Sequence, residues 1–313
     1  MHRLPHLLAL LAVPAVLSAQ APDPAPLAER FIGMTAVAGY EAPALDSVQA
    51  LLPGARRDRA GNVVLARGSG PAVLVVCPFD EVGYVVGGVR DDGWLTLRRV
   101  GARAPGPFFD QFHEGQRVTL FGRRGALPAV VAVRSVHLSR GRAAAEAPFT
   151  VDDAFVDLGA ANAADVRRAG VDVLTPVALR KEAWRYGAGL LAGPWAGRRA
   201  ACAALVAAAG AAPNGRVVVA VAVEQELGQR GLRTLANVAG PFSATLLVDG
   251  APGAAGALPE RTDTLLARRL PGLGVVRRLA LPARNAGTPV ESVSLADVTA
   301  LRDRIAAWIG GAR

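Results

Sequence analysis

The sequence predicts an α/β protein, in which helices flank a mostly parallel sheet and a small β-rich domain is inserted into that core. Three observations predict this fold class. Strand-like and helix-like segments alternate in the first and last parts of the chain, a pattern typical of wound parallel sheets. The run at 216–223 (RVVVAVAV) is continuously apolar, as expected of a strand covered on both faces. The middle of the chain instead contains short strand-like runs punctuated by turns.

The first core segments are predicted in the order helix, strand, strand. Apolar residues recur with helical spacing in Pro43–Leu52. Two short runs rich in β-branched residues follow, at 62–66 and 72–77, with the turn signal Gly68-Ser69-Gly70 between them. The last part of the chain continues this alternation with a small-residue helix, three strands and an amphipathic closing helix, at 200–209, 216–223, 244–248, 273–281 and 295–309.

The inserted domain is predicted over residues 82–180, which leaves 22–81 and 181–313 as one discontinuous core. The strand Val82–Val89 runs into Asp91-Asp92-Gly93, a hairpin-turn signal. The further elements expected here are strands at 94–100, 116–121 and 130–136 and one helix at 163–170.

Residues 1–21 have the pattern of a secretory signal peptide. Arg3 precedes the apolar run Leu7–Leu17, and Ala19-Gln20-Ala21 has the A-x-A form of a cleavage site. The run is shorter than the ~20 residues of a membrane span. We therefore expect a protein exported to the periplasm or outside the cell, with no membrane partner after cleavage.

Composition narrows the partners and leaves the state of the cysteines open. The formal net charge is +9, from 35 Lys+Arg and 26 Asp+Glu, but Lys181 is the only lysine and the arginines are scattered in pairs. No long basic run alternates with aromatic residues, so we predict no nucleic-acid partner. In an oxidising compartment Cys77 and Cys202 could form a disulfide; two buried free thiols are equally consistent with their apolar surroundings.

Eight spaced segments together resemble one known family, the glutamyl aminopeptidases or tetrahedral aminopeptidases, family forty-two of the metallopeptidases. In chain order they are GYEAP (39–43), DRAGNVV (58–64), FDEVGYVV (79–86), DDGWLTLRRVG (91–101), GQRVTLFG (115–122), FVDLGAANAADVRRAGV (155–171), EQELGQRG (224–231) and TPVESVSLADV (288–298). The resemblance implies a metallo-aminopeptidase-like core with an inserted β domain, and a homo-oligomer that assembles through that domain.

The resemblance also implies two divalent metals, zinc or cobalt, held at five ligand positions, and three of these positions lack a donor atom here. Pro78 stands where the family has its first histidine, Gly197 where a bridging aspartate is expected, and Gly287 where the last histidine is expected. The retained ligand positions are Glu226 and Asp249.

The family position of the general base is Gln225, which cannot accept a proton at neutral pH. An ion held by a single carboxylate would stay hydrated and weakly bound. His113 and His137 fall in the inserted domain, away from these positions. We therefore expect no catalytic residues and no metal cofactor.

These substitutions lead to two functional hypotheses. The first is a catalytically inactive aminopeptidase-like protein, a pseudoenzyme, that binds a peptide or protein ligand or serves as an assembly subunit. The alternative is an active metallo-aminopeptidase, a peptide hydrolase with an altered metal site that binds the two metals.

Three further residues are candidates for the pocket: Asp80, Arg198 and Asp263. Asp80 would converge with Glu226 and Asp249, and carboxylates in one cleft repel each other. The Arg198 guanidinium could pair with them in place of the missing cations, or could point to solvent at the start of its helix. Asp263 follows a Gly/Ala/Pro-rich link, 250–260, so short that we predict the loss of an α/β crossover near the pocket.

Overall fold

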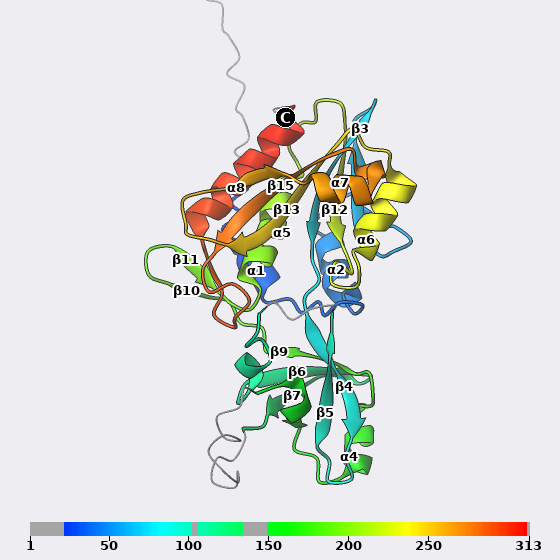
Figure 1. The fold of residues 1–313 in the computed structure, drawn as a ribbon, viewed down its shortest axis with the longest axis vertical. Coiled ribbons are helices and arrows are strands. Elements are labelled where there is room, and N and C mark those ends of the chain that lie inside the picture. Colours follow the sequence, from blue (N-terminus) through cyan, green and yellow to red (C-terminus); the bar gives the residue numbers. More distant parts are fainter. Residues whose placement is uncertain (1–21, 102–105, 134–148, 312–313) are drawn as a thin grey trace, which may run out of the picture.

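The computed structural model describes residues 22–101, 106–133 and 149–311, and it confirms the predicted fold class (Figure 1). The predicted signal peptide and His137 lie outside the described residues. None of the helices within these ranges combines the length and hydrophobicity that a membrane span requires.

A seven-stranded mixed sheet forms the core. Its three central pairings, β12 with β3, β3 with β13 and β13 with β15, are parallel, and the pairings at both edges are antiparallel. In spatial order the strands are β1 (Arg56–Arg57), β2 (Val63–Arg67), β12 (Arg216–Ala222), β3 (Ala72–Pro78), β13 (Ala244–Pro252), β15 (Val275–Ala283) and β14 (Glu260–Thr262).

Helices cover both faces of this sheet, which explains why its central strands are apolar throughout. Along β3, Val73 and Val75 face one cluster of buried side chains, whereas Leu74 and Val76 face another. The first cluster lies under α1 (Ala25–Ile32), α2 (Ala42–Gln49), α5 (Ala196–Ala208) and α8 (Leu295–Ile309). The second lies under α6 (Arg230–Thr234), which continues as a π-helical turn (Leu235–Ala239), and under α7 (Thr264–Arg269) and a 3₁₀ turn (Pro271–Leu273).

The inserted β-rich domain is a closed six-stranded barrel that begins where β3 ends (Figure 1). It has its own buried core, built around Tyr84, Leu97 and Leu120. In barrel order the strands are β4 (Gly83–Val89), β5 (Leu95–Val100), β8 (Phe155–Asp157), β7 (Gly125–Val131), β6 (Arg117–Gly122) and β9 (Pro176–Leu179). It also carries α4 (Ala163–Arg168) and 3₁₀ turns at Gln111–His113 and Val151–Asp153. A separate small sheet, β10 (Trp184–Tyr186), β11 (Leu190–Ala192) and β16 (Ser292–Ser294), follows the barrel.

The predicted local structure needs two corrections. The strand expected at 130–136 begins earlier, at Gly125, and ends at Val131, while residues 134–136 lie outside the described part. Helix α1 has no counterpart among the predicted elements. Proline is tolerated in the first turn of a helix, where its missing N–H costs nothing, and Pro26 occupies that place in α1.

Candidate functional site

Four of the predicted residues, Asp80, Arg198, Glu226 and Asp249, meet where the parallel strands end, around the start of α5. Asp80 follows β3, Glu226 follows β12, and Asp249 lies within β13. These three strands run parallel to one another, so their carboxyl ends lie on the same side of the sheet. Ligands of open α/β sheets commonly bind at the carboxyl ends of the strands. Arg198 reaches these strand ends from the first turn of α5.

The Arg198 guanidinium lies between the two retained ligand positions, as one of the two sequence hypotheses predicted. Its Nη1 donates to Glu226 Oε1 at 2.9 Å and to the Asp80 carbonyl oxygen at 2.7 Å. Its Nε and Nη2 donate to Asp249 Oδ1 and Oδ2 at 3.1 and 3.3 Å. The side chain is 12% exposed. Burial lowers the pKa of Arg198, but the charges of the surrounding carboxylates outweigh burial and hold it above its usual value.

The indole ring of Trp195 forms one wall beside this arginine. The Arg198 Cζ atom lies 5.4 Å from the ring centroid, within the range of a cation–π contact. Trp195 precedes α5 with a φ of 63°, a left-handed conformation that is uncommon for a large side chain. The ring also contacts Phe109 of the barrel, at 6.4 Å between centroids, so Trp195 joins the site to the inserted domain.

Two buried carboxyl groups hold the turn that carries Glu226. Asp80 accepts from the backbone N–H groups of Gln225 and Glu226 at 2.9 and 2.8 Å, and Glu41 accepts from that of Glu224 at 2.9 Å. Burial raises the pKa of Asp80, and burial together with the nearby Asp80 charge raises the pKa of Glu41 to about 7. Gln225, at the expected position of the general base, therefore takes part through its backbone.

A third buried carboxyl group, Glu291, links two of the positions that lack a metal donor. Its Oε1 accepts from the Gly197 N–H at 2.6 Å and its Oε2 from the Gly287 N–H at 2.8 Å. Burial raises the pKa of Glu291. The side chain thus fixes the backbone of the loop before α8 against the first turn of α5.

The residues present do not fit a pair of divalent ions. Pro78 has no side-chain donor, and a Cβ atom at Gly197 would lie 2.8 Å from Glu291 Oε1 and 3.0 Å from the Ala283 Cβ. The backbone at 197 therefore has no room for a bridging carboxylate as it stands. Glu226 and Asp249 both form ion pairs with Arg198. Within the described ranges, no group of three or more His, Cys, Asp or Glu side chains is arranged to hold a metal ion.

The site nevertheless has an excess of acidic groups. Asp80, Glu226, Asp249 and Glu291 contribute four carboxyl groups around the guanidinium of Arg198, so these five groups carry a net charge of −3 when all are ionised. The raised pKa values of Asp80 and Glu291 reduce this charge without removing it. A cationic group of a ligand would therefore be favoured here.

A buried ion cluster lies behind this pocket. Glu81 Oε2 accepts from Lys181 Nζ at 2.8 Å and from Arg199 Nη2 at 2.6 Å, and all three side chains are at most 4% exposed. Although burial raises it, the two cations hold the pKa of Glu81 below its usual value. The only lysine of the chain is therefore a structural residue that joins the end of the barrel to the core.

The structure also joins the two cysteines, which the sequence left open. Cys77 on β3 and Cys202 on α5 form a disulfide with Cα atoms 5.5 Å apart, and both are fully buried. The bridge fixes the strand that ends at Pro78 to the helix that carries Arg198.

Asp263 does not join the site, so its prediction as a pocket residue is wrong. It caps α7 by accepting from the Leu266 N–H at 2.8 Å and forms an ion pair with Arg278. Since β14 lies at the edge of the sheet, beyond β15, this carboxylate is separated from Asp249 by an intervening strand. Within the predicted link, 250–260, residues 253–259 contain no helix or strand.

Sequence reasoning missed Glu41, Trp195 and Glu291 as parts of the site. Glu41 and Glu291 lie in two segments that carried the family resemblance, GYEAP and TPVES, and that position was the available signal. His113 is where it was expected, in the barrel. Its Nδ1 lies 2.9 Å from the Phe109 carbonyl oxygen, and burial lowers its pKa to about 4.

Comparison with known proteins gives the same family as the motifs. The family model described as M42 glutamyl aminopeptidase matches residues 61–263. The lysyl aminopeptidase of Pyrococcus furiosus is 25% identical over 215 residues, which cover 66% of this chain and 61% of that protein. SgcX of Escherichia coli K12, an aminopeptidase by name, is 30% identical over 184 residues, covering 56% and 48%. The matched region spans about half the length of such relatives.

Solved structures share the fold over almost the whole chain. The TET1 peptidase of Pyrococcus horikoshii superposes with a TM-score of 0.81 at 20% identity, covering 92% of this chain and 99% of that one. An aminopeptidase from Desulfurococcus kamchatkensis superposes with a TM-score of 0.77 at 18% identity, covering 92% and 94%.

Proposed function

This chain belongs to the M42 glutamyl aminopeptidase family, and from that premise we propose that it keeps the family fold without metal-dependent peptide hydrolysis and binds peptides instead. The observation that carries the proposal is the position of Arg198, which occupies both retained ligand carboxylates. A guanidinium cannot polarise a carbonyl or activate water as a metal ion does. A buried ion pair of this kind also resists replacement, because removing one partner leaves an uncompensated charge.

The ligand class follows from the charge of the pocket. Asp249 and Glu291 line the pocket beside Arg198, and Asp80 and Glu226 lie close to the same guanidinium. This excess of carboxyl groups favours a cation, and Trp195 forms one wall of the pocket. The α-ammonium group at the start of a peptide is such a cation. The cavity between Trp195 and Gly287 has a volume of about 180 Å³, so only a small group fits beside the ammonium.

Two measurements on the purified chain test the loss of hydrolysis. Metal analysis should find zinc and cobalt well below one ion per chain, and aminoacyl p-nitroanilides should not be hydrolysed even with added zinc or cobalt. Stoichiometric metal together with turnover would overturn the proposal and establish the alternative, an active metallo-aminopeptidase with an altered site.

Calorimetric titration tests the ligand class. A short peptide with a free amino terminus should bind, whereas the same peptide with an acetylated amino terminus should bind at least tenfold more weakly. Trp195→Leu should weaken the binding of the peptide with a free amino terminus. Trp184→Leu, at an exposed tryptophan of β10, is the matched control and should leave this binding unchanged. Equal binding of the two peptides would rule out recognition of the ammonium group.

We also propose that the chain assembles with copies of itself through the inserted barrel. Phe108 and Phe112 on the barrel are 53% and 39% exposed, and exposed aromatic side chains are enriched at interfaces. The relative TET1 is described as assembling into a tetrahedron or an octahedral shell. Light scattering should show an oligomer that Phe108→Ser with Phe112→Ser dissociates and that Trp184→Ser leaves intact.

Export is the remaining part of the proposal. The leader pattern of residues 1–21 supports it, and so does the disulfide, since disulfides persist in oxidising compartments. Amino-terminal sequencing of the protein from its host should place the first residue near Pro22, and a cytoplasmic, uncleaved chain would contradict this.

A further inference from the structure

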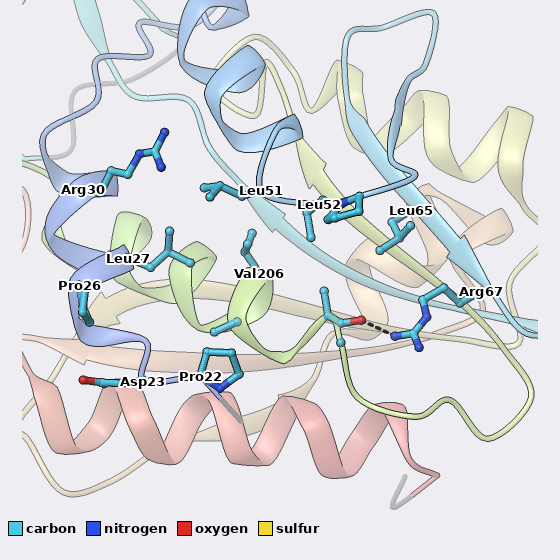
Figure 2. Close-up of a pocket in the computed structure, with 14 residues that line it drawn as sticks. Pro22, Asp23, Pro26, Leu27, Arg30, Leu51, Leu52, Leu65, Arg67 and Val206 are labelled. Atoms are coloured by element: carbon cyan, nitrogen blue, oxygen red, sulfur yellow. Dashed lines mark hydrogen bonds between the residues drawn. The ribbon is translucent and has the colours of Figure 1, made fainter. Parts of the chain in front are cut away.

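A second concave surface lies at the opposite end of α5 from Arg198. Segments that are far apart in the sequence form it: α1, the end of α2, β2 and the last turn of α5 (Figure 2). Its floor is aliphatic and includes Leu27, Leu51, Leu52, Leu65 and Val206. Leu52 and Val206 are buried, whereas the other three are half-buried, so apolar surface remains open to a ligand in this groove.

Two guanidinium groups lie at the two ends of the row of leucines (Figure 2). Arg67 donates to the carbonyl oxygens of Ala209 and Ala211 at 2.6 and 3.0 Å, which fixes it at the end of α5. Arg30 is exposed in the last turn of α1, and within the described part of the chain it forms no ion pair. Asp23 also lines the rim, where it accepts from the Ala25 N–H, so the rim carries two positive groups and one negative.

This combination differs in chemistry from the candidate functional site. That site is acidic and small, whereas the groove has a cationic rim and a long aliphatic floor. An apolar floor favours a hydrocarbon chain, since each methylene removed from water contributes to binding. The exposed guanidinium of Arg30, which has no ion-pair partner among the described residues, favours a carboxylate, which it can bind through two parallel hydrogen bonds.

We propose that this groove binds an anionic amphiphile, a molecule with an aliphatic tail and a carboxylate head. The tail lies along the leucines between α1 and β2, and the head pairs with Arg30. Arg67, which is held by the carbonyl groups at the end of α5, adds positive potential at the far end without being the primary partner.

The length of the tail gives the first test. Calorimetric titration of the full chain with octanoate, decanoate and dodecanoate should show affinity rising about fourfold per added methylene, until the tail exceeds the groove. Decanol has the same tail without the charge and should bind at least tenfold more weakly than decanoate. Equal affinity for decanol and decanoate would overturn the assignment of the head group.

Matched variants give the second test. Arg30→Gln should weaken the binding of decanoate at least tenfold, whereas Arg167→Gln should leave the affinity for decanoate unchanged. Arg167 is a matched control because it is also exposed in the last turn of a helix, but that helix is α4 of the barrel. Ala207→Trp, at a half-buried position that lines the groove, should also reduce binding. Circular dichroism checks that each variant is folded.

The proposed ligand is a free fatty acid, whose head group is a carboxylate, and vesicles test the other source of an aliphatic tail with an anionic head. Phosphatidylglycerol carries a phosphodiester in its head group, so vesicles of this lipid should not retain the chain. If decanoate does not bind, if the vesicles retain the chain and Arg30→Gln releases it, or if Arg30→Gln and Arg167→Gln behave alike, the proposal is wrong.

Discussion

At the scale of single residues, Arg198 determines the electrostatics of the candidate site. It is the cation that both Glu226 and Asp249 contact, and all three side chains are at most 21% exposed. Pairs that are partly removed from water are screened less by solvent than surface pairs. Loss of the guanidinium would leave two carboxylates close together without a counter-charge.

Arg198→Met should therefore lower the free energy of unfolding by about 3–5 kcal/mol, the range found when one partner of a buried pair is removed. Arg230→Met is the control, since Arg230 also pairs with a glutamate, Glu224, but is 62% exposed. In the control variant the free energy of unfolding should fall by about 1 kcal/mol or less. Urea unfolding measures both values, and equal losses would show that Arg198 is not a buried counter-ion.

Glu41 gives the site a titration near neutral pH. Its pKa is raised from 4.5 to about 7 in the folded protein, so the folded state binds more protons than the unfolded state between these values. The stabilisation is complete below pH 4.5 and is lost as pH rises through 7, by about 3 kcal/mol in total. His113 acts in the opposite direction, because its pKa is lowered from 6.5 to about 4 and its contribution is lost as pH falls.

Glu41→Gln should remove the first effect and keep the hydrogen bond to the Glu224 N–H, since an amide oxygen still accepts. The stability of the variant relative to the natural protein should rise by about 3 kcal/mol between pH 4.5 and pH 8. Urea unfolding at a series of pH values measures this difference. Parallel curves for the two proteins would mean that Glu41 does not titrate in this range.

At the scale of elements, the start of α5 is packed directly against β13. A Cβ atom at Gly197 would lie 3.2 Å from the Gly250 Cα atom, and one at Gly250 would lie 2.5 Å from the Gly197 carbonyl carbon. The two glycines therefore let helix and strand approach more closely than side chains would permit. This packing, and not only the missing carboxylate, separates the site from a metal centre.

Gly197→Ala should consequently destabilise the protein by about 1–3 kcal/mol, the usual cost of overpacking. Gly210→Ala is a matched control just beyond the other end of α5, where a Cβ atom would meet nothing within 4 Å. The free energy of unfolding of Gly210→Ala should stay within about 0.5 kcal/mol of that of the natural protein. Thermal unfolding compares the two, and a tolerated Gly197→Ala would show that the contact can relax.

The Cys77–Cys202 bridge connects β3 and α5 across a sequence separation of 125 residues. Cross-links that close long loops restrict the unfolded chain, so replacing both cysteines by alanine should lower the free energy of unfolding by about 2–5 kcal/mol. Guanidinium unfolding with and without reductant measures this. Reductant should destabilise the natural protein and leave the double variant unchanged; a natural protein insensitive to reductant would contradict the prediction.

At the scale of the whole molecule, long periodic elements were predictable and short or distant pairings were not. The helix Leu295–Ile309 was predicted to the residue, because its apolar face repeats over fifteen residues and Ser294 caps it. Strand β9 was missed, since four residues give no clear period. Closure of the barrel depends on β9 pairing with β4 and β6 far away in the sequence, and no local pattern encodes that.

The candidate site was predictable to a similar extent. The pairing of Arg198 was one of two alternatives that its place beside a lost acidic position left open. The roles of Glu41 and Glu291 did not, because both act by accepting from backbone N–H groups of distant segments. Such contacts depend on the tertiary fold, so they become visible only when the elements are placed together.

The bridge between β3 and α5 also determines which environments the fold tolerates. At the carboxyl end of β3, the sheet is joined to α5 by the Cys77–Cys202 disulfide and by the ion pairs of Arg198. A chelator can remove neither of these connections. Surroundings starved of zinc should therefore leave the molecule intact. Surroundings rich in glutathione should loosen it, so we expect the lifetime of this protein to follow the redox state of its compartment and not the supply of metal.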